Sequence, residues 1–358
     1  MALAARDTLV LVTGATGYLA SHVVKLLLNE GYRVRGTCRN VKDTLKLAPV
    51  RALANDERLE MVEADLLKSG AWKKVLDGCH YVLHVASPYP VVEDESIIKT
   101  AVDGTLNVLK AAAATPSVRK VVLTSSALAI IEGNSYENVF TEKIWANEES
   151  RNMTFYPRSK VLAEKAAWDF VGGISTGNRF AFTVICPGWI CGPPLVNEQG
   201  GASVTLVRRL LEHDMPGLPK VQLPAVDVRD AARCHVEAMR RTSTDGQRIM
   251  AVSTPCPWFK DLACALNKEF SSQGYRIPTM EVPNFVICFM SHFANDAKQV
   301  VDHLGQELKM DNGKAVELLG MKFISPLESV VEMAYVMIEK GMAKKTSDYR
   351  GMPLKRSE

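Results

Sequence analysis

A tyrosine and a lysine four residues apart are the strongest candidates for chemistry in this chain. They occur in the stretch Tyr156-Pro157-Arg158-Ser159-Lys160, and residues i and i+4 share one face of a helix. A free tyrosine, with a pKa of about 10, is a poor proton donor at neutral pH. A neighbouring ammonium lowers that pKa because it stabilises the tyrosinate. The pair could therefore move a proton, although a surface helix with a salt-bridging lysine is the simpler alternative.

The proline after the tyrosine indicates where this helix begins. Proline is tolerated in the first helical turn, where its missing N–H is not needed. The sequence predicts a helix from about Pro157 to Val171, with Tyr156 at its entrance rather than in its middle.

A serine at a strand end could complete the site. The apolar run Val121-Val122-Leu123 leads into Thr124, Ser125 and Ser126. Ligands of parallel sheets bind beyond the carboxyl ends of the strands. Ser126 could donate a hydrogen bond to a substrate carbonyl and stabilise a developing oxyanion. Ser125 is the alternative, because neighbouring residues of a strand face opposite sides.

A glycine-containing turn near the N-terminus predicts a dinucleotide site. Residues 13–20 read T-G-A-T-G-Y-L-A, directly after an apolar run and before a helical pattern. Gly14 permits a tight turn, Gly17 lets the backbone approach a pyrophosphate, and Ala20 allows close packing. The helix N-terminus supplies N–H groups and a positive dipole end. Alternatively, the turn is only structural. The candidate cofactor residues in it are Thr13, Gly14, Thr16, Gly17, Tyr18 and Leu19.

The end of the second predicted strand favours NADP(H) over NAD. An acidic residue there would accept a hydrogen bond from the ribose 2′-hydroxyl of NAD, but Arg39 occupies that place. A guanidinium suits a 2′-phosphate, and the alternative is an arginine that faces water. Asp65, at the end of the third strand, is a candidate for contact with the adenine edge.

The elements that position these residues follow an alternating strand–helix pattern. Tyr81–Ala86 and Val118–Thr124 are near-continuous apolar runs, as in parallel strands that are buried on both faces, and Leu59–Ala64 shows the alternation of a strand. The other expected strands are Leu9–Thr13, Tyr32–Cys38, Phe180–Cys186 and Arg248–Val252. Two helical patterns in this part are a Leu-rich segment that ends at Gly31 and the segment Ile97–Ala114. The pattern predicts an α/β fold, a Rossmann-type doubly wound parallel sheet.

The composition and the predicted secondary structure of the chain change after Pro187. Pro and Gly become frequent, and helical patterns dominate, at Val204–His213, Val228–Arg240, Trp258–Phe270, Val286–His303 and Leu327–Lys340. We expect residues 1–187 to form an NADP-binding Rossmann domain, with returning segments near 221–255. Residues 188–358 should be mostly a smaller, mainly helical substrate-binding lobe.

The composition excludes several other classes of protein. The net charge of the 358 residues is only +3, which gives no reason to expect a nucleic-acid partner. No apolar run approaches the ~20 residues of a membrane span, so we expect a cytoplasmic protein. The eight cysteines form no C-x-x-C pair, which predicts reduced, buried thiols. The seven histidines show no metal-ligand spacing, and His84, inside an apolar run, is expected to be a core residue.

With these residues, the chain resembles the extended short-chain dehydrogenases/reductases, and within them the dihydroflavonol-4-reductase-like branch of NADPH-dependent carbonyl reductases. The motifs that carry the resemblance, besides Arg39, are T-G-A-T-G-Y-L-A (13–20), H-V-A-S-P (84–88), G-T-L-N-V-L-K-A (104–111), L-T-S-S-A (123–127), Y-P-R-S-K-V-L-A-E-K-A-A-W (156–168), P-G-W-I-C-G-P (187–193) and V-D-V-R-D-A-A (226–232). They extend over roughly two-thirds of the chain.

The resemblance implies roles for individual residues. Ser126, Tyr156 and Lys160 would form the catalytic triad, with Tyr156 and Lys160 also beside the cofactor. Further cofactor contacts are implied for Leu66, Ala86, Ser87, Thr124, Pro187, Gly188 and Ile190.

Two departures from family patterns narrow the function. Flavonoid reductases have an asparagine five residues after the catalytic serine, but this chain has Ile131, so a buried hydrogen bond to a phenol cannot form. Ala101 replaces an asparagine of many extended members and, with Arg39, argues against a sugar epimerase. Tyr89, Ile131 and Trp189 are expected to bound an apolar substrate pocket, together with Ile130 and Leu195.

The leading hypothesis is an enzyme that reduces a ketone or aldehyde to an alcohol with NADPH and works as a monomer or homodimer. One alternative is a 3β-hydroxysteroid-type dehydrogenase that works in the oxidative direction. A non-catalytic NADP-binding regulatory protein on the same fold is the other.

Overall fold

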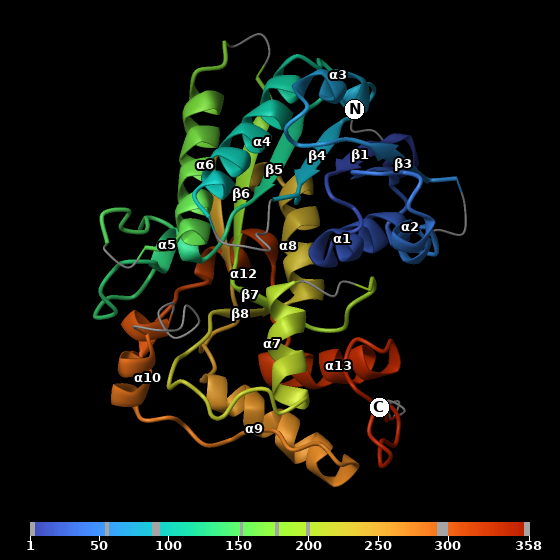
Figure 1. Ribbon diagram of the computed structural model, residues 1–358. Coiled ribbons are helices and arrows are strands. Elements are labelled where there is room, and N and C mark those ends of the chain that lie inside the picture. The colour runs from blue at the N-terminus through green and yellow to red at the C-terminus, as the bar shows by residue number, and fades with distance from the viewer. Residues whose placement is uncertain are drawn as a thin grey trace.

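The centre of the molecule is a parallel sheet of seven strands (Figure 1). The computed structural model describes residues 4–53, 57–87, 94–150, 153–175, 179–197, 201–291 and 300–353. The strand order is β3-β2-β1-β4-β5-β6-β9, and every neighbouring pair is parallel. The strands are β1 (Leu9–Val12), β2 (Arg33–Cys38), β3 (Leu59–Glu63), β4 (Tyr81–His84), β5 (Lys120–Thr124), β6 (Ala181–Pro187) and β9 (Arg248–Ala251). The predicted fold class is confirmed.

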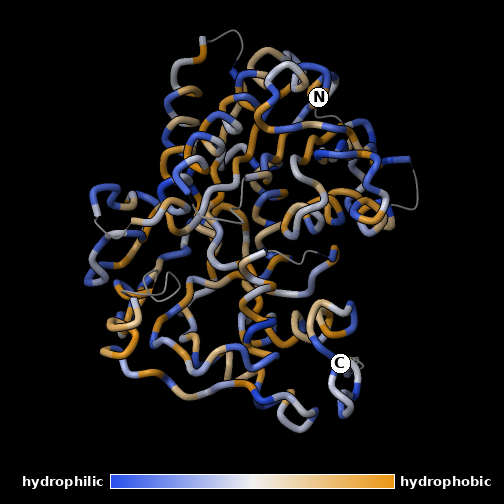
Figure 2. The backbone as a smooth tube through the Cα atoms, viewed as in Figure 1, coloured by the Kyte–Doolittle hydropathy of each residue, from blue (hydrophilic) through white to orange (hydrophobic). Residues whose placement is uncertain are grey.

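Helices cover both faces of the sheet, and the alternation of side chains along β1 separates the two layers. Leu9 and Leu11 of β1 belong to one core, whereas Val10 and Val12 belong to the other. The first core includes residues of α3 (Ser69–Leu76), α4 (Ser96–Ala113) and α6 (Phe155–Gly172). The second includes residues of α1 (Tyr18–Asn29), α2 (Thr44–Arg51), α8 (Val228–Arg240) and α12 (Gly313–Leu319). Figure 2 shows hydrophobic strands inside a more hydrophilic outer layer.

The strand order reverses beside β1, and this places the cofactor turn. β1 pairs with β2 on one side and with β4 on the other, so that Val10 lies between Val34 and Tyr81. Open α/β sheets bind ligands in the crevice at such a switch point, outside the carboxyl ends of the strands. The turn that starts at Thr13 and the segment that follows β4 both lie at this edge of the sheet.

A smaller, mainly helical part of the chain lies below the sheet in Figure 1. It contains a two-stranded parallel sheet of β7 (Trp189–Cys191) and β8 (Ala225–Asp227). A third core is built mainly from α7 (Ala202–Leu211), α9 (Phe259–Phe270) and α13 (Pro326–Glu339). The remaining helices are α5 (Leu128–Ile131), α10 (Asn284–Met290) and the short 3-10 turns η1 (Ala5–Asp7), η3 (Thr242–Thr244), η4 (Ser271–Gln273) and η5 (Val301–His303). The division of the chain at residue 187 stays a prediction.

Most predicted elements are present within a few residues of their expected ends. The prediction of one helix over Val286–His303 is answered only in part, because α10 ends at Met290, η5 begins at Val301 and residues 292–299 lie outside the described ranges. The sequence analysis did not anticipate α2, α3, α5, α12 or the short strands β7 and β8.

The cysteine side chains are mostly buried, as predicted, but not all of them. Six of the eight are buried, whereas Cys264 and Cys288 are exposed, and none of the eight is in a disulfide. Their reduced state stays a prediction. Within the described ranges, no group of three or more His, Cys, Asp and Glu side chains could hold a metal ion. None of the described helices is long and apolar enough to cross a membrane.

Candidate active site

The turn after β1 has a backbone shape that only glycine adopts easily. Gly14 has a φ of +65°, and a Cβ at this position would lie 2.9 Å from the Cβ of Ala86. Gly17 is the N-cap of α1 and provides no side-chain cap. The first N–H groups of a helix have no acceptor within the helix, so the N-terminus of α1 presents N–H donors and a positive dipole end to an anion. This cradle fits a pyrophosphate.

Side chains from the neighbouring strands hold the turn in place. The backbone N–H of Gly14 donates to Thr37 Oγ1 at 2.9 Å. Thr13 Oγ1 accepts a hydrogen bond from the Ala86 N–H at 2.9 Å and bonds to His84 Nδ1 at 2.8 Å. Because burial lowers the pKa of His84 to about 3, its imidazole is neutral. His84 is the core residue that the sequence predicted.

The other predicted residues of this turn divide between core and surface. Leu19 is buried in the core beneath α1, so that only its backbone could meet a phosphate. Tyr18 Oη donates to the carbonyl of Gly192 at 2.5 Å, away from the turn itself. Thr16 is half-buried within the turn.

The strand ends beside the turn carry the two residues expected near the adenosine part of a cofactor. Arg39 directly follows β2 and is exposed. Asp65 follows β3, and its Oδ1 accepts a hydrogen bond from the Leu67 N–H at 3.0 Å. Leu66 packs against Gly104, where an added Cβ would lie 3.0 Å from the Leu66 Cβ. The three residues lie at one edge of the sheet, because β2 and β3 are parallel neighbours.

The candidate catalytic pair, Tyr156 and Lys160, lies in the first two turns of α6. The helix begins at Phe155 with Thr154 as its N-cap, so the predicted place of Tyr156 at the helix entrance is confirmed. Lys160 Nζ lies 5.7 Å from the centre of the Tyr156 ring. Lys160 is only 7% exposed, and burial lowers its pKa to about 8. The ammonium is therefore close enough to act on the phenol electrostatically.

The two serines after β5 have different partners. Ser125 Oγ donates to Glu164 Oε2 at 2.6 Å in the protein interior. Ser126 Oγ accepts a hydrogen bond from the Leu128 N–H at 3.2 Å, at the start of α5. Since Ser125 is committed to a buried carboxylate, this arrangement favours Ser126 as the serine that faces a ligand. Thr124 Oγ1 is bound to His235 Nε2 at 2.7 Å, which leaves its backbone for any cofactor contact.

The segment after β6 passes very close to the strand end of β8. The carbonyl of Pro187 accepts a hydrogen bond from the Ala127 N–H at 2.8 Å, which joins it to the serine segment. A Cβ on Gly188 would lie 1.7 Å from the Pro224 carbonyl oxygen, so only glycine fits. The Trp189 N–H donates to the same carbonyl oxygen at 2.6 Å.

The residues expected around a substrate differ in how deeply they are buried. Ile131 is 2% exposed and packs within the core. The Nε1 atom of Trp189 is buried without a hydrogen-bond partner among the described residues. Ile190, Ala86 and Ser87 are half-buried. Tyr89 lies outside the described residues.

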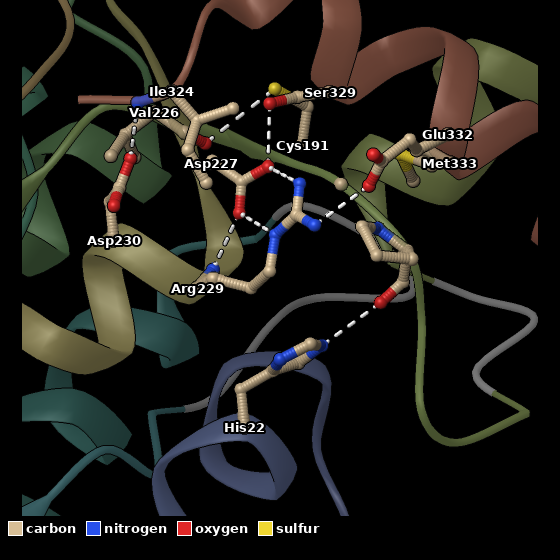
Figure 3. Close-up of polar contacts among 12 residues, drawn as sticks. His22, Cys191, Val226, Asp227, Arg229, Asp230, Ile324, Ser329, Glu332 and Met333 are labelled. Atoms are coloured by element: carbon tan, nitrogen blue, oxygen red, sulfur yellow. Dashed lines mark hydrogen bonds and ion pairs between the residues drawn. The ribbon is translucent and has the colours of Figure 1, made fainter. Parts of the chain in front are cut away.

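A charged cluster joins the small sheet to α8 and α13 (Figure 3). Arg229 makes ion pairs of 2.7 Å with Asp227 and with Glu332 of α13. Ser329 Oγ donates to Asp227 Oδ2 at 2.5 Å. Burial alone would raise the pKa of Asp227, but its hydrogen bonds to Arg229 and Ser329 hold that pKa below its usual range. In the same view, His22 of α1 bonds to the carbonyl of Pro193 at 2.9 Å.

The profile of the NAD dependent epimerase/dehydratase family matches residues 10–252. The chain belongs to this family. The matched range runs from β1 to the end of β9 and contains all three candidate catalytic residues. The expected membership of the extended short-chain dehydrogenases/reductases, and the expected oxidoreductase class, are confirmed.

Reductases are prominent among the relatives. Cinnamoyl-CoA reductase CAD2 of Medicago truncatula is 36% identical over 253 residues, which cover 67% of this chain and 75% of the relative. Tetraketide alpha-pyrone reductase 1 of Arabidopsis thaliana is 30% identical over 341 residues, which cover 93% of this chain and 96% of the relative. The crystal structure of yeast methylglyoxal/isovaleraldehyde reductase Gre2, complexed with NADPH, has a TM-score of 0.78 at 28% identity and covers 94% of this chain and 100% of that protein.

Sequence analysis missed two residues that contact the site. Glu164 and Arg248 form a buried ion pair beneath the serine segment. The signal for Glu164 was its place four residues after Lys160, on the same helix face. Arg248 gave a weaker signal, as a charge at the start of an apolar strand.

Proposed function

We propose that this protein reduces a ketone or an aldehyde to an alcohol with NADPH, through Ser126, Tyr156 and Lys160. The observation that carries the proposal is the ammonium of Lys160, buried 5.7 Å from the centre of the Tyr156 ring at a helix entrance. A solvent-facing helix with a salt-bridging lysine would leave that ammonium exposed. A buried ammonium beside a phenol suits proton transfer to a developing alkoxide.

NADPH fits the residues at the switch point and would supply the hydride when bound. The glycine cradle and the N-terminus of α1 would hold the pyrophosphate, and the exposed Arg39 would pair with the 2′-phosphate. The yeast structure named above was solved with NADPH, which supports the same cofactor here. The proposed contacts are Thr13, Gly14, Thr16, Gly17, Tyr18, Leu19, Arg39, Asp65, Leu66, Ala86, Ser87, Thr124, Tyr156, Lys160, Pro187, Gly188 and Ile190.

The three catalytic side chains have separate tasks. Ser126 would hold the carbonyl oxygen with its hydroxyl, and Tyr156 would give its proton to that oxygen as negative charge develops. Lys160 would stabilise the tyrosinate and donate to the nicotinamide ribose. Because burial lowers the pKa of Lys160 to about 8, its support weakens above that pH unless the bound cofactor restores the charge.

The proposed substrate is apolar around its carbonyl group. Ile131 replaces the polar residue with which flavonoid reductases hold a catechol ring, and Trp189 contributes a further apolar surface. A buried isoleucine cannot satisfy a substrate hydroxyl, so a hydroxylated ring would lose hydrogen bonds on binding.

The test is NADPH oxidation, followed by absorbance, across a panel of ketones and aldehydes. Tyr156→Phe should abolish turnover but leave NADPH binding intact, since the ring stays in place. Tyr32→Phe, which removes a phenol beside the amino end of β2, is the matched control and should retain full activity. Turnover that survives in Tyr156→Phe would refute the mechanism.

The same assay separates the two alternatives. A steroid-type dehydrogenase should prefer NAD in a binding titration and oxidise alcohols. A regulatory protein should bind NADPH tightly but leave the whole panel unreduced.

A further inference from the structure

A glutamate with no role in the proposed mechanism lies directly behind the catalytic residues. Glu164 follows Lys160 by one helical turn of α6 and shares its face. The side chain of Glu164 is 0% exposed. An unpaired carboxylate is strongly unfavourable in such a place, so its partners must stabilise it.

Five donors from four residues surround the Glu164 carboxylate, and the weakest is the Cys186 thiol, whose Sγ lies 3.9 Å from Oε2. Arg248 donates from Nε to Oε1 at 2.5 Å and from Nη2 to Oε2 at 3.2 Å. Ser125 Oγ donates to Oε2 at 2.6 Å, and Trp168 Nε1 donates to Oε1 at 3.2 Å. Because an ionised carboxylate only accepts hydrogen bonds, the hydroxyl proton of Ser125 points toward α6. The carboxylate thus joins β5, β9 and α6.

The guanidinium of Arg248 extends these contacts to α5, the short helix that follows the serine segment. Its Nη1 donates to the carbonyls of Glu142 and Ile144 at 2.8 and 2.9 Å. Its Nη2 reaches the carbonyl of Ala129 in α5 at 3.4 Å. The ring of Trp145 lies 3.7 Å from the guanidinium carbon, which adds a cation–π contact. The arginine therefore binds the chain that follows the candidate serine directly, and reaches the residue before that serine only through Glu164.

We propose that Glu164 and Arg248 are positioning residues that, by holding Ser125, set the distance between the end of β5 and the catalytic face of α6. The inference rests on the proposed function, because that distance matters when both elements act on one substrate. Ser126 is the next residue after Ser125, so a shift of one moves the other. Misplacement of a catalytic group by about 1 Å can lower a rate about 100-fold.

The ion pair also keeps the surroundings of Lys160 free of an uncompensated charge. Glu164→Gln would remove a negative charge one helical turn from Lys160 and leave Arg248 without its counter-charge. A nearby positive charge stabilises tyrosinate, so the pKa of the Tyr156 phenol should fall in this variant. A purely structural role of the pair would not move that pKa in a fixed direction.

The first experiment compares Ser125→Ala with Ser125→Thr, which restores a hydroxyl. Ser125→Ala should lower kcat by about tenfold or more, whereas the NADPH dissociation constant should change less than about twofold. Ser125→Thr should recover most of the lost kcat. A kcat for Ser125→Ala within about twofold of the unmodified protein overturns the proposal.

The second experiment measures the pKa of the Tyr156 phenol by ultraviolet titration. The signal of Tyr156 is the difference between the titration of each protein and that of the same protein with Tyr156→Phe. Glu164→Gln should lower the phenol pKa, and Ser125→Ala should leave it in place. The matched control is Glu148→Gln, because Glu148 pairs with Lys165 of α6 where both are partly exposed. This control should leave kcat, NADPH binding and the phenol pKa unchanged.

A double variant covers the outcome in which Glu164→Gln does not fold. Glu164→Leu/Arg248→Met removes both charges, and buried ion pairs are often replaced by apolar side chains without loss of stability. This variant should still bind NADPH, but its kcat should be at least about tenfold lower than that of the unmodified protein. A normal kcat would overturn the proposal.

The phenol titration needs no turnover, so it separates the two proposals. If the unmodified protein binds NADPH but reduces no carbonyl, the proposed function fails, and a lowered phenol pKa in Glu164→Gln still supports the positioning pair. An unshifted phenol in that variant refutes the pair whatever the activity.

Discussion

Lys160 should reduce the stability of the cofactor-free protein. Lys160→Met should therefore make the folded protein more stable, although it should abolish activity. Among the described residues, no group accepts a hydrogen bond from Nζ, and burial lowers its pKa from 10.5 to about 8. Each pKa unit corresponds to about 1.4 kcal/mol. The shift of about 2.5 units thus gives a penalty on the order of 3 kcal/mol while the lysine is charged in both states.

The pH dependence follows from the sign of this shift. Between pH 8 and 10.5 the unfolded chain holds the Lys160 proton and the folded chain has lost it, so stability rises with pH across this window. Below about pH 8 the penalty is present in full. The advantage of Lys160→Met should therefore be largest at neutral pH and disappear toward pH 10.5.

Urea denaturation without cofactor, repeated across this pH range, measures the effect. Lys120→Met is the matched control, because Lys120 is also buried but donates to the carbonyl of Arg241, to Thr244 and to Asp245. It should lose about 2 kcal/mol or more, since these partners would be left without their donor. A Lys160→Met protein that is no more stable than the unmodified one, or whose gain does not vary with pH, would refute the reasoning.

Two further comparisons test the glycine turn and the charged cluster. Gly14→Ala should lose about 2–5 kcal/mol of stability and bind NADPH much more weakly, because it combines a strained φ with a clash. Gly78→Ala, at a φ of +72° with nothing within 4 Å, should show only the strain of about 1–2 kcal/mol and bind NADPH normally. Arg229→Met should lose about 2–3 kcal/mol, because Asp227 stays buried without its ion pair. Arg240→Met, which breaks only exposed pairs, should lose less than about 1 kcal/mol. Urea denaturation and fluorescence titration with NADPH measure these effects, and equal losses within either pair would contradict the assigned contacts.

The parts of the fold that the sequence predicted depend on local patterns. Apolar runs identified central strands such as β4 and β5, since parallel strands are buried on both faces, and alternation identified β3. Elements of unusual length or composition were missed. β8 has only the three residues Ala225–Asp227, and α2 contains Pro49 within its eight residues. Neither gives a periodic pattern long enough to recognise.

The candidate site shows the same division between local and long-range information. The spacing of Tyr156 and Lys160 is a property of one helix and could be predicted. The choice between Ser125 and Ser126 could not, because it depends on a carboxylate 39 residues away in the chain. Arg248 holds that carboxylate from 84 residues away, and its only local signal is a charge at the start of an apolar strand, which does not name its partner.

Helix α1 links the cofactor turn to the smaller part of the molecule. Its N-terminus forms the proposed phosphate cradle, while Tyr18 and His22 bind the carbonyls of Gly192 and Pro193, directly after β7. Burial lowers the pKa of His22 to about 4, so its ring is neutral near pH 7 and must donate from Nε2 to the carbonyl. The His22 contact therefore does not change charge in the neutral range. The segment that follows the proposed nicotinamide site is therefore held to the phosphate cradle by one rigid helix, so any shift of α1 on cofactor binding would move both ends of the site together.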